Sequence, residues 1–237
     1  MSVEFRIMGV RKRREQFILP MLESLKMNED IVFYDDEYNY EKKNINALRC
    51  CKRTFLAPTD KTHICVMQDD LELCDNFVEI VEECAKRFPN AIFSFYQPRL
   101  KPEEKCNETP YVKIKGSGMY GQCIMIPSYM VKVVFAWSDA NYGEDYIHSD
   151  TVIGFFCEVN GIPVMATHPC IVQHLGCSDS AMGYNNKNKV SKIYDKHPDI
   201  AQFKTKKFVV SKYIPNTPIP PEGGYKCGSL RKLKDLL

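Results

Sequence analysis

Two adjacent carboxylates, Asp69 and Asp70, end an apolar run in this 237-residue chain and are well placed to do chemistry. The run, residues 64–67 (ICVM), has the length and composition of a buried strand. In open α/β sheets, ligands bind just outside the carboxyl ends of the strands, so Gln68, Asp69 and Asp70 stand where a ligand is expected. Carboxylates together with a diphosphate suit Mg²⁺ or Mn²⁺, and a cation would relieve the repulsion between the two charges. The alternative is a solvated turn that caps a helix starting near Asp75.

A block of four basic residues, 11–14 (RKRR), directly follows the apolar segment 3–10 (VEFRIMGV). The pattern predicts a first strand that leads into a helix. Basic side chains at such a junction can combine with the N–H groups of a helix N-terminus to bind phosphate. We therefore assign Arg11, Arg13 and Arg14 to the binding of a phosphorylated ligand. A solvated basic turn is the alternative for each of the three.

Two further segments are candidates for nucleotide contacts. The apolar run 31–34 (IVFY) ends in Asp35 and Asp36, and acidic residues after the second strand of a nucleotide-binding α/β unit often bind the ribose or the base. The stretch 116–127 (GSGMYGQCIMIP) carries three glycines, among them Gly121, which allow a ligand to approach the backbone closely. No Gly-Lys-Ser/Thr follows, so this stretch is not a P-loop.

These residues need a scaffold, and the apolar patterns predict one in which strands and helices alternate. Further strands are expected at 91–96 and 162–166, with a short one ending at His174, and helices at 16–27, 41–55, 76–87, 130–137 and 149–160. Pro20 either kinks the first helix or marks a late start, Asp75 caps the third, and Gly161 closes the last. Repeated strand–helix units predict an α/β fold with a single Rossmann-like, mainly parallel sheet and helices on both faces.

Composition places the chain among ordinary globular proteins. It is 44% hydrophobic and 26% charged, and its net charge of +2 does not demand a nucleic-acid partner. We expect a catalytic domain at 1–183 and a Lys- and Pro-rich extension at 184–237, packed on the domain or strapped over it. No stretch reaches 18 apolar residues and the first residues lack the apolar core of a signal peptide, so neither a membrane span nor a leader is expected. The 11 cysteines show no metal-site spacing and are expected to be reduced, buried thiols of a cytoplasmic protein, in preference to a disulfide framework.

Three segments, taken in order, resemble the GT-A glycosyltransferases, which use nucleotide sugars and a divalent metal. The run QDDLELCDNF at 68–77 looks like that family's EDDLxxxPDFF pattern, with Gln68 in place of an acidic residue. The run SDTVIG at 149–154 is similar to a DDxxxG helix start, with Ser149 in place of the first Asp. The run VQHLGCSDS at 172–180 is similar to a vqHxGxxSs ending. The resemblance covers roughly residues 3 to 183.

The resemblance implies a role for each matching residue. Asp70 and His174 would hold Mn²⁺ or Mg²⁺, Gln68 and Asp69 would contact the nucleotide sugar, and Asp150 would be the general base of an inverting transfer. Because Ser149 replaces an Asp, the pair Glu144–Asp145 is a rival for the base. The alternatives are that His174 is a hydrogen-bonded core histidine and that Asp150 is a helix cap.

The expected activity is therefore transfer of a sugar from a nucleoside-diphosphate sugar to an acceptor hydroxyl. The small, Lys- and Asn-rich chain looks like enzymes encoded by phages or large DNA viruses, which would place it in the host cytoplasm. The acceptor is expected to be a glycan or protein, or, as the minority alternative, a hydroxymethylated DNA base. The alternative from another class is a glycosyltransferase-like binding module without catalysis, suggested by the departures at Gln68 and Ser149.

Overall fold

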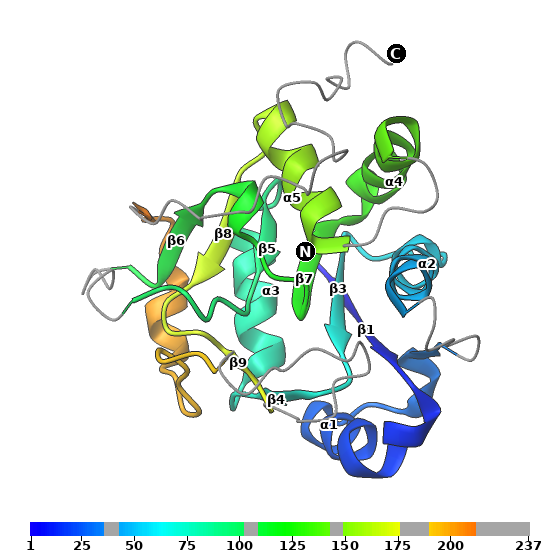
Figure 1. The fold of residues 1–237 in the computed structure, drawn as a ribbon. Helices are drawn as coiled ribbons and strands as arrows, with labels where there is room; N and C mark the ends of the chain where they lie inside the picture. Colours follow the sequence, from blue (N-terminus) through cyan, green and yellow to red (C-terminus); the bar gives the residue numbers. More distant parts are fainter. Residues whose placement is uncertain (36–42, 102–108, 143–148, 176–189, 212–237) are drawn as a thin grey trace.

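The computed structural model describes residues 1–35, 43–101, 109–142, 149–175 and 190–211 (Figure 1). Its main sheet has eight strands in the order β10-β6-β8-β5-β7-β3-β1-β2, and a second sheet pairs β4 with β9. The strands are β1 (Val3–Gly9), β2 (Val32–Tyr34), β3 (His63–Gln68), β4 (Leu71–Leu73), β5 (Ile92–Ser94), β6 (Tyr111–Ile114), β7 (Cys123–Pro127), β8 (Val164–Thr167), β9 (Val172–His174) and β10 (Val209–Val210). The α-helices are α1 (Leu19–Leu25), α2 (Lys43–Leu56), α3 (Phe77–Arg87), α4 (Ser128–Tyr142) and α5 (Ser149–Asn160).

The main sheet is mixed, and this refines the predicted architecture. β1 runs parallel to both β2 and β3, β5 runs parallel to β8, and β10 runs parallel to β6. β7 is antiparallel to both of its neighbours, β3 and β5, and β6 is antiparallel to β8. The prediction of a single sheet is wrong in one respect, because the chain turns at Asp69 and Asp70 and then forms β4, which leaves the main sheet and pairs with β9.

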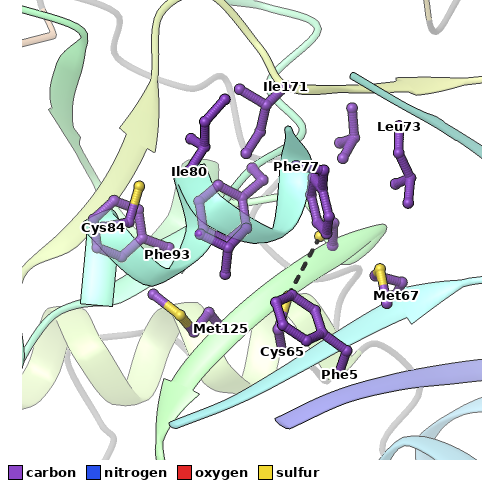
Figure 2. Close-up of a cluster of buried hydrophobic side chains, with 14 of the residues drawn as sticks. Phe5, Cys65, Met67, Leu73, Phe77, Ile80, Cys84, Phe93, Met125 and Ile171 are labelled. Carbon is purple, nitrogen blue, oxygen red and sulfur yellow. Dashed lines mark hydrogen bonds between the residues drawn. The ribbon is translucent and has the colours of Figure 1, made fainter. Parts of the chain in front are cut away.

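Helices cover both faces of the main sheet, as the sequence predicts (Figure 1). One apolar cluster joins α1 and α3 to side chains from β1, β3, β5 and β7, and Figure 2 shows Phe77 and Ile80 of α3 above Phe5, Phe93 and Met125 of the strands. The second cluster joins α2, α4 and α5 to the opposite face. Trp137 belongs to this second cluster and is buried, which makes it a core residue.

The starts of α1 and α3 test the predicted roles of Pro20 and Asp75. A π-helical turn, Arg14–Ile18, precedes α1, and Pro20 stands in the first positions of the α-helix, so the late start is the correct alternative. The prediction that Asp75 caps α3 is wrong. Asn76 takes the capping position with a left-handed backbone (φ 58°), and the Asp75 carboxylate instead lies 2.7 Å from Nδ1 of His197.

Residues 190–211 pack against the sheet and α3. Phe203, in the short helical turn Ile200–Lys204, is fully buried in the first cluster, and the hydroxyl of Tyr111 donates to its carbonyl at 2.7 Å. The eight cysteines in the described ranges are all unpaired and buried, in line with the prediction of small buried thiols. None of the helices in the described part of the chain is long and apolar enough to span a membrane.

Candidate active site

The carboxyl ends of β1, β2 and β3 lie side by side, and the two aspartates follow β3 directly. The register pairs Met8 with Gln68 and Gly9 with Tyr34, which aligns the three strand ends. Asp69 lies against Gly9, and a Cβ placed on Gly9 would be 2.9 Å from the Cβ of Asp69. Glycine at this position therefore lets the carboxylate reach the end of β1.

Asp69 is held by the turn that follows β1. The backbone N–H of Val10 donates to its Oδ2 at 2.9 Å, and Nη1 of Arg13 lies 3.1 Å from its Oδ1. Arg13 ends the short helical turn Arg11–Arg13, and its own N–H donates to the carbonyl of Val10 at 2.9 Å. Both oxygens of Asp69 are thus engaged within the protein.

Arg13 also bridges to Asp70. The same nitrogen, Nη1, lies 3.1 Å from Oδ2 of Asp70, and all three side chains are at most 7% exposed. Burial and the neighbouring charge of Asp70 raise the pKa of Asp69 to about 6, against the opposing effect of Arg13. Burial also raises the pKa of Asp70, but the hydrogen bond and charge of His174 and the charge of Arg13 outweigh it and lower the pKa overall. One guanidinium thus faces two carboxylates in a site with little solvent.

His174 meets Asp70 because of the small sheet. Pairing of β4 with β9 sets His174 opposite Leu71, and the N–H of Leu175 donates to the carbonyl of Asp70 at 3.0 Å. Nε2 of the buried imidazole then lies 3.2 Å from Oδ2 of Asp70. The ring centroid of Tyr96 lies 6.1 Å from that of the imidazole.

Asp70 has one oxygen to spare. Its Oδ1 is buried and has no hydrogen-bond partner among the described residues. A buried carboxylate oxygen without a partner is costly unless something absent from the structure binds it. A hard cation fits this atom, and His174, whose Nε2 lies 3.2 Å from the other oxygen of the same carboxylate, would supply a second ligand.

The protein alone does not offer a complete cage. Within the described ranges, no group of three or more His, Cys, Asp or Glu side chains is arranged to hold a metal ion. Mg²⁺ and similar ions are commonly held by one or two carboxylates and complete their shell with phosphate oxygens and water. Asp70 and His174 therefore fit an ion that arrives with a phosphorylated ligand.

Asp150 is brought to the glycine-rich stretch. A Cβ placed on Gly121 would lie 3.2 Å from the Cβ of Asp150 and 3.6 Å from its Oδ2. The other oxygen, Oδ1, accepts the N–H of Thr151 at 2.8 Å. Gly121 lies at the same edge of the sheet as the end of β3, because the carbonyl of the next residue, Gln122, accepts the N–H of Gln68 at 2.8 Å. The predicted base and the predicted metal site are therefore at the same edge.

Two glycines set the position of α5, which carries Asp150. Gly154 of α5 and Gly116, which begins the short turn Gly116–Gly118, touch backbone to backbone. A Cβ on Gly154 would lie 2.1 Å from the carbonyl oxygen of Gly116. On its other side, α5 contacts α2, where Cys51 is hydrogen-bonded to Ser149 and burial raises the pKa of Cys51 to about 12.

Three other predicted residues have contacts outside the Arg13–Asp69–Asp70–His174 group. The guanidinium of Arg14 pairs with Glu29 and Glu15, and that of Arg11 stacks 4.5 Å above the ring of Tyr34. Asp35 lies at the end of β2, where its N–H donates to the carbonyl of Gly9 at 2.8 Å. Asp36, Glu144 and Asp145 lie outside the described residues.

Gln122 is a candidate site residue that the sequence prediction missed. Its side-chain Oε1 is buried and has no hydrogen-bond partner in the described part of the chain, although the residue adjoins both Gly121 and the end of β3. The only signal for it in the sequence is a single amide side chain between a glycine and the apolar run of β7.

Comparison with models of known protein families and with curated proteins finds no match to this chain. The geometry of the site is therefore what bears on function.

Proposed function

We propose that this protein is a metal-dependent glycosyltransferase of the GT-A type that transfers a sugar from a nucleoside-diphosphate sugar to an acceptor hydroxyl with inversion. The observation that carries the proposal is the Asp70–His174 pair. Two residues that are far apart in the sequence, each assigned to the metal by resemblance, meet at 3.2 Å at the end of a central strand, with one buried carboxylate oxygen left over. Asp150 lies at the same edge, against Gly121.

Asp70 and His174 would hold Mn²⁺ or Mg²⁺, and Arg13 would bind a phosphate oxygen. The metal, when bound, stabilises the negative charge that develops on the diphosphate as it leaves. Arg13 supplies a second positive charge and a donor geometry that matches phosphate. Asp69 keeps Arg13 and the end of β1 in register with Asp70, because it binds both the Arg13 guanidinium and the Val10 N–H.

Asp150 would accept the proton of the acceptor hydroxyl. The acceptor oxygen forms a bond to the anomeric carbon as the bond from that carbon to the diphosphate breaks, and the proton moves to the carboxylate. Oδ1 of Asp150 is occupied by the Thr151 N–H, so Oδ2, the oxygen near Gly121, is the candidate for the proton transfer. One base suffices for a transfer with inversion.

The proposal extends to the acceptor and to the location of the enzyme. A glycan or protein acceptor is favoured by the small net charge, and a modified DNA base would need a positive surface, for which α2 offers the exposed Arg49 and Arg53. Buried, unpaired cysteines suit the cytoplasm, which would be the host cytoplasm for a virus-encoded enzyme. A DNA-acceptor enzyme should bind duplex DNA with a steep dependence on salt, and a glycan enzyme should not.

The test is thermal unfolding with the nucleoside diphosphates of the five common bases, each with and without Mn²⁺, on wild type and Asp70→Asn. A ligand at 100 times its Kd adds about 2.7 kcal/mol of stability. For a domain of this size that raises Tm by about 5–11 °C, at roughly 2–4 °C per kcal/mol. We expect one diphosphate to do so in wild type with Mn²⁺ only, and not in Asp70→Asn.

Asp75→Asn is the matched control, because Asp75 lies on the same stretch of chain but contacts His197 at the surface. It should respond to the nucleotide as wild type does. Asp150→Asn should keep the thermal shift and lose transfer, since Asp150 acts on the acceptor. If no nucleotide shifts the melting of wild type under any metal condition, the glycosyltransferase proposal fails and the binding-module alternative replaces it.

A further inference from the structure

We infer that Arg13 makes the binding of metal and of diphosphate depend on each other: it occupies the aspartate pair until a diphosphate takes it over. The inference deepens the proposed function and rests on it. It starts from a single atom, Nη1 of Arg13, which lies 3.1 Å from Asp69 Oδ1 and 3.1 Å from Asp70 Oδ2. This nitrogen therefore stands between the carboxylates where a bridging cation would be attracted.

Arg13 opposes a metal that arrives alone. An ion held by Asp70 and His174 would bind the same carboxylate whose Oδ2 Arg13 already contacts, so the ion and the guanidinium would lie close to each other. The side chains of Arg13, Asp69 and Asp70 are at most 7% exposed, so neither water nor salt screens the repulsion between the two cations. Metal binding without a counter-anion should consequently be weak.

The aspartate pair opposes a diphosphate that arrives alone. Two carboxylates face one guanidinium, and Asp69 Oδ1 and Asp70 Oδ2 each lie 3.1 Å from the same nitrogen of Arg13. An anion would have to compete for Arg13 against both. A diphosphate and a metal that arrive together relieve both conflicts, because the metal neutralises the carboxylates while the guanidinium turns to the phosphate.

The geometry allows Arg13 to leave without disrupting the strand ends. Asp69 keeps the hydrogen bond from the Val10 N–H to its Oδ2 when the guanidinium is withdrawn from Oδ1. The backbone of Arg13 stays anchored, because its N–H donates to the Val10 carbonyl. The movement is then confined to the Arg13 side chain, whose guanidinium carbon lies 5.6 Å from the centroid of the Phe17 ring.

The experiment measures Mn²⁺ affinity from the paramagnetic resonance signal of free Mn²⁺, with and without inorganic pyrophosphate as the diphosphate probe. The Mn²⁺–pyrophosphate complex is measured in buffer without protein and subtracted. In wild type, pyrophosphate should strengthen Mn²⁺ binding by roughly 5- to 150-fold, the usual range of coupling between two binding sites. By linkage, Mn²⁺ should strengthen pyrophosphate binding by the same factor.

Arg13→Gln removes the competing charge. It should bind Mn²⁺ alone at least about fivefold more tightly than wild type does, and pyrophosphate should strengthen its Mn²⁺ binding by a smaller factor than in wild type, because only direct coordination of the metal by phosphate remains. Arg87→Gln is the control, because Arg87 is also an arginine in an ion pair, but its partner is Glu83 on the same helix, α3. It should bind Mn²⁺ as wild type does, with and without pyrophosphate.

Two kinds of result would overturn the inference: one contradicts the role of Arg13 alone, and the other contradicts the proposed metal site as well. If folded Arg13→Gln binds Mn²⁺ alone no better than wild type, or if wild type shows no coupling at all, the role of Arg13 is wrong and the metal site remains. The wild-type measurement decides the matter even where Arg13→Gln does not fold. If wild type takes up no Mn²⁺ with or without pyrophosphate, or if Asp70→Asn binds it equally well, the proposed metal site fails too.

Discussion

Replacing Gly154 by alanine is a sharp test of the structure, because local and tertiary effects have opposite signs. Gly154 lies in the middle of α5, where alanine is the better helix former by about 0.5–1 kcal/mol. The structure places a Cβ at this position 2.1 Å from the carbonyl oxygen and 2.8 Å from the carbonyl carbon of Gly116. Real Cβ atoms essentially never come within 3.0 Å, so α5 and the glycine-rich stretch would have to separate by about 1 Å.

The expected loss follows from these two terms. Overpacking costs about 1–3 kcal/mol, and the upper end applies because the atoms that must move belong to the backbone. After the gain in helix propensity of about 0.5–1 kcal/mol, the net loss is about 2 kcal/mol. At roughly 2–4 °C per kcal/mol, Tm should fall by about 4–8 °C.

Thermal and urea unfolding, followed by circular dichroism, would measure this loss. Gly161→Ala is the control at the end of the same helix: Gly161 has φ 69° and nothing within 4 Å of its would-be Cβ, so alanine meets only the backbone cost of a left-handed residue, about 1–2 kcal/mol. Gly154→Ala should also impair transfer, because α5 carries Asp150, whereas Gly161→Ala should not. A Tm above that of wild type for Gly154→Ala would show that helix propensity decides and that the contact between Gly154 and Gly116 does not exist.

Two further predictions concern buried charges. Arg6 is 1% exposed and donates to four backbone carbonyls at the end of α2, those of Thr54, Phe55, Ala57 and Pro58. Arg6→Met should therefore lower the free energy of unfolding by about 3–5 kcal/mol. A loss below about 1 kcal/mol in urea unfolding would contradict this account. The pKa of Asp69 is raised to about 6 from an ordinary value of 3.8, so the folded state binds the extra proton and stability should fall as pH rises from about 4 to 7. The fall should be about 3 kcal/mol, at 1.36 kcal/mol per pKa unit, measured by unfolding in EDTA; Asp69→Asn should flatten it, and an unchanged slope in that variant would assign the proton elsewhere.

The strands and helices were largely predictable, but their pairing was not. Residues 64–67 and the apolar part of 116–127 read alike as buried strands, and the structure makes them the neighbours β3 and β7. A strand covered on both faces shows no alternation of polar and apolar residues, so its pattern does not indicate direction. That β7 runs antiparallel between β3 and β5 depends on pairing over long sequence distances, which local periodicity does not encode.

In the candidate site, too, the residues next to a predicted strand were predictable and the contacts between distant segments were not. The rule that ligands bind at the carboxyl ends of strands located Asp69 and Asp70 from the apolar run before them. His174 was assigned only by resemblance, because its approach to Asp70 depends on the three-residue register of β4 with β9. The contact between Gly121 and Asp150 depends on how closely α5 packs against Gly116, and no spacing in the sequence specifies the packing of α5 on Gly116.

The basic block shows how local geometry selects one side chain from four. Residues on a short helical turn point in directions roughly 120° apart, so consecutive arginines cannot all face the same strand end. The turn after β1 closes when the Arg13 N–H donates to Val10, while the Val10 N–H donates to Asp69. This pair of bonds directs Arg13 at the carboxylates and leaves Arg14 to Glu29 and Arg11 to Tyr34. The sequence places four basic residues after β1, and the hydrogen bonds of Val10 determine which of them contacts the aspartates.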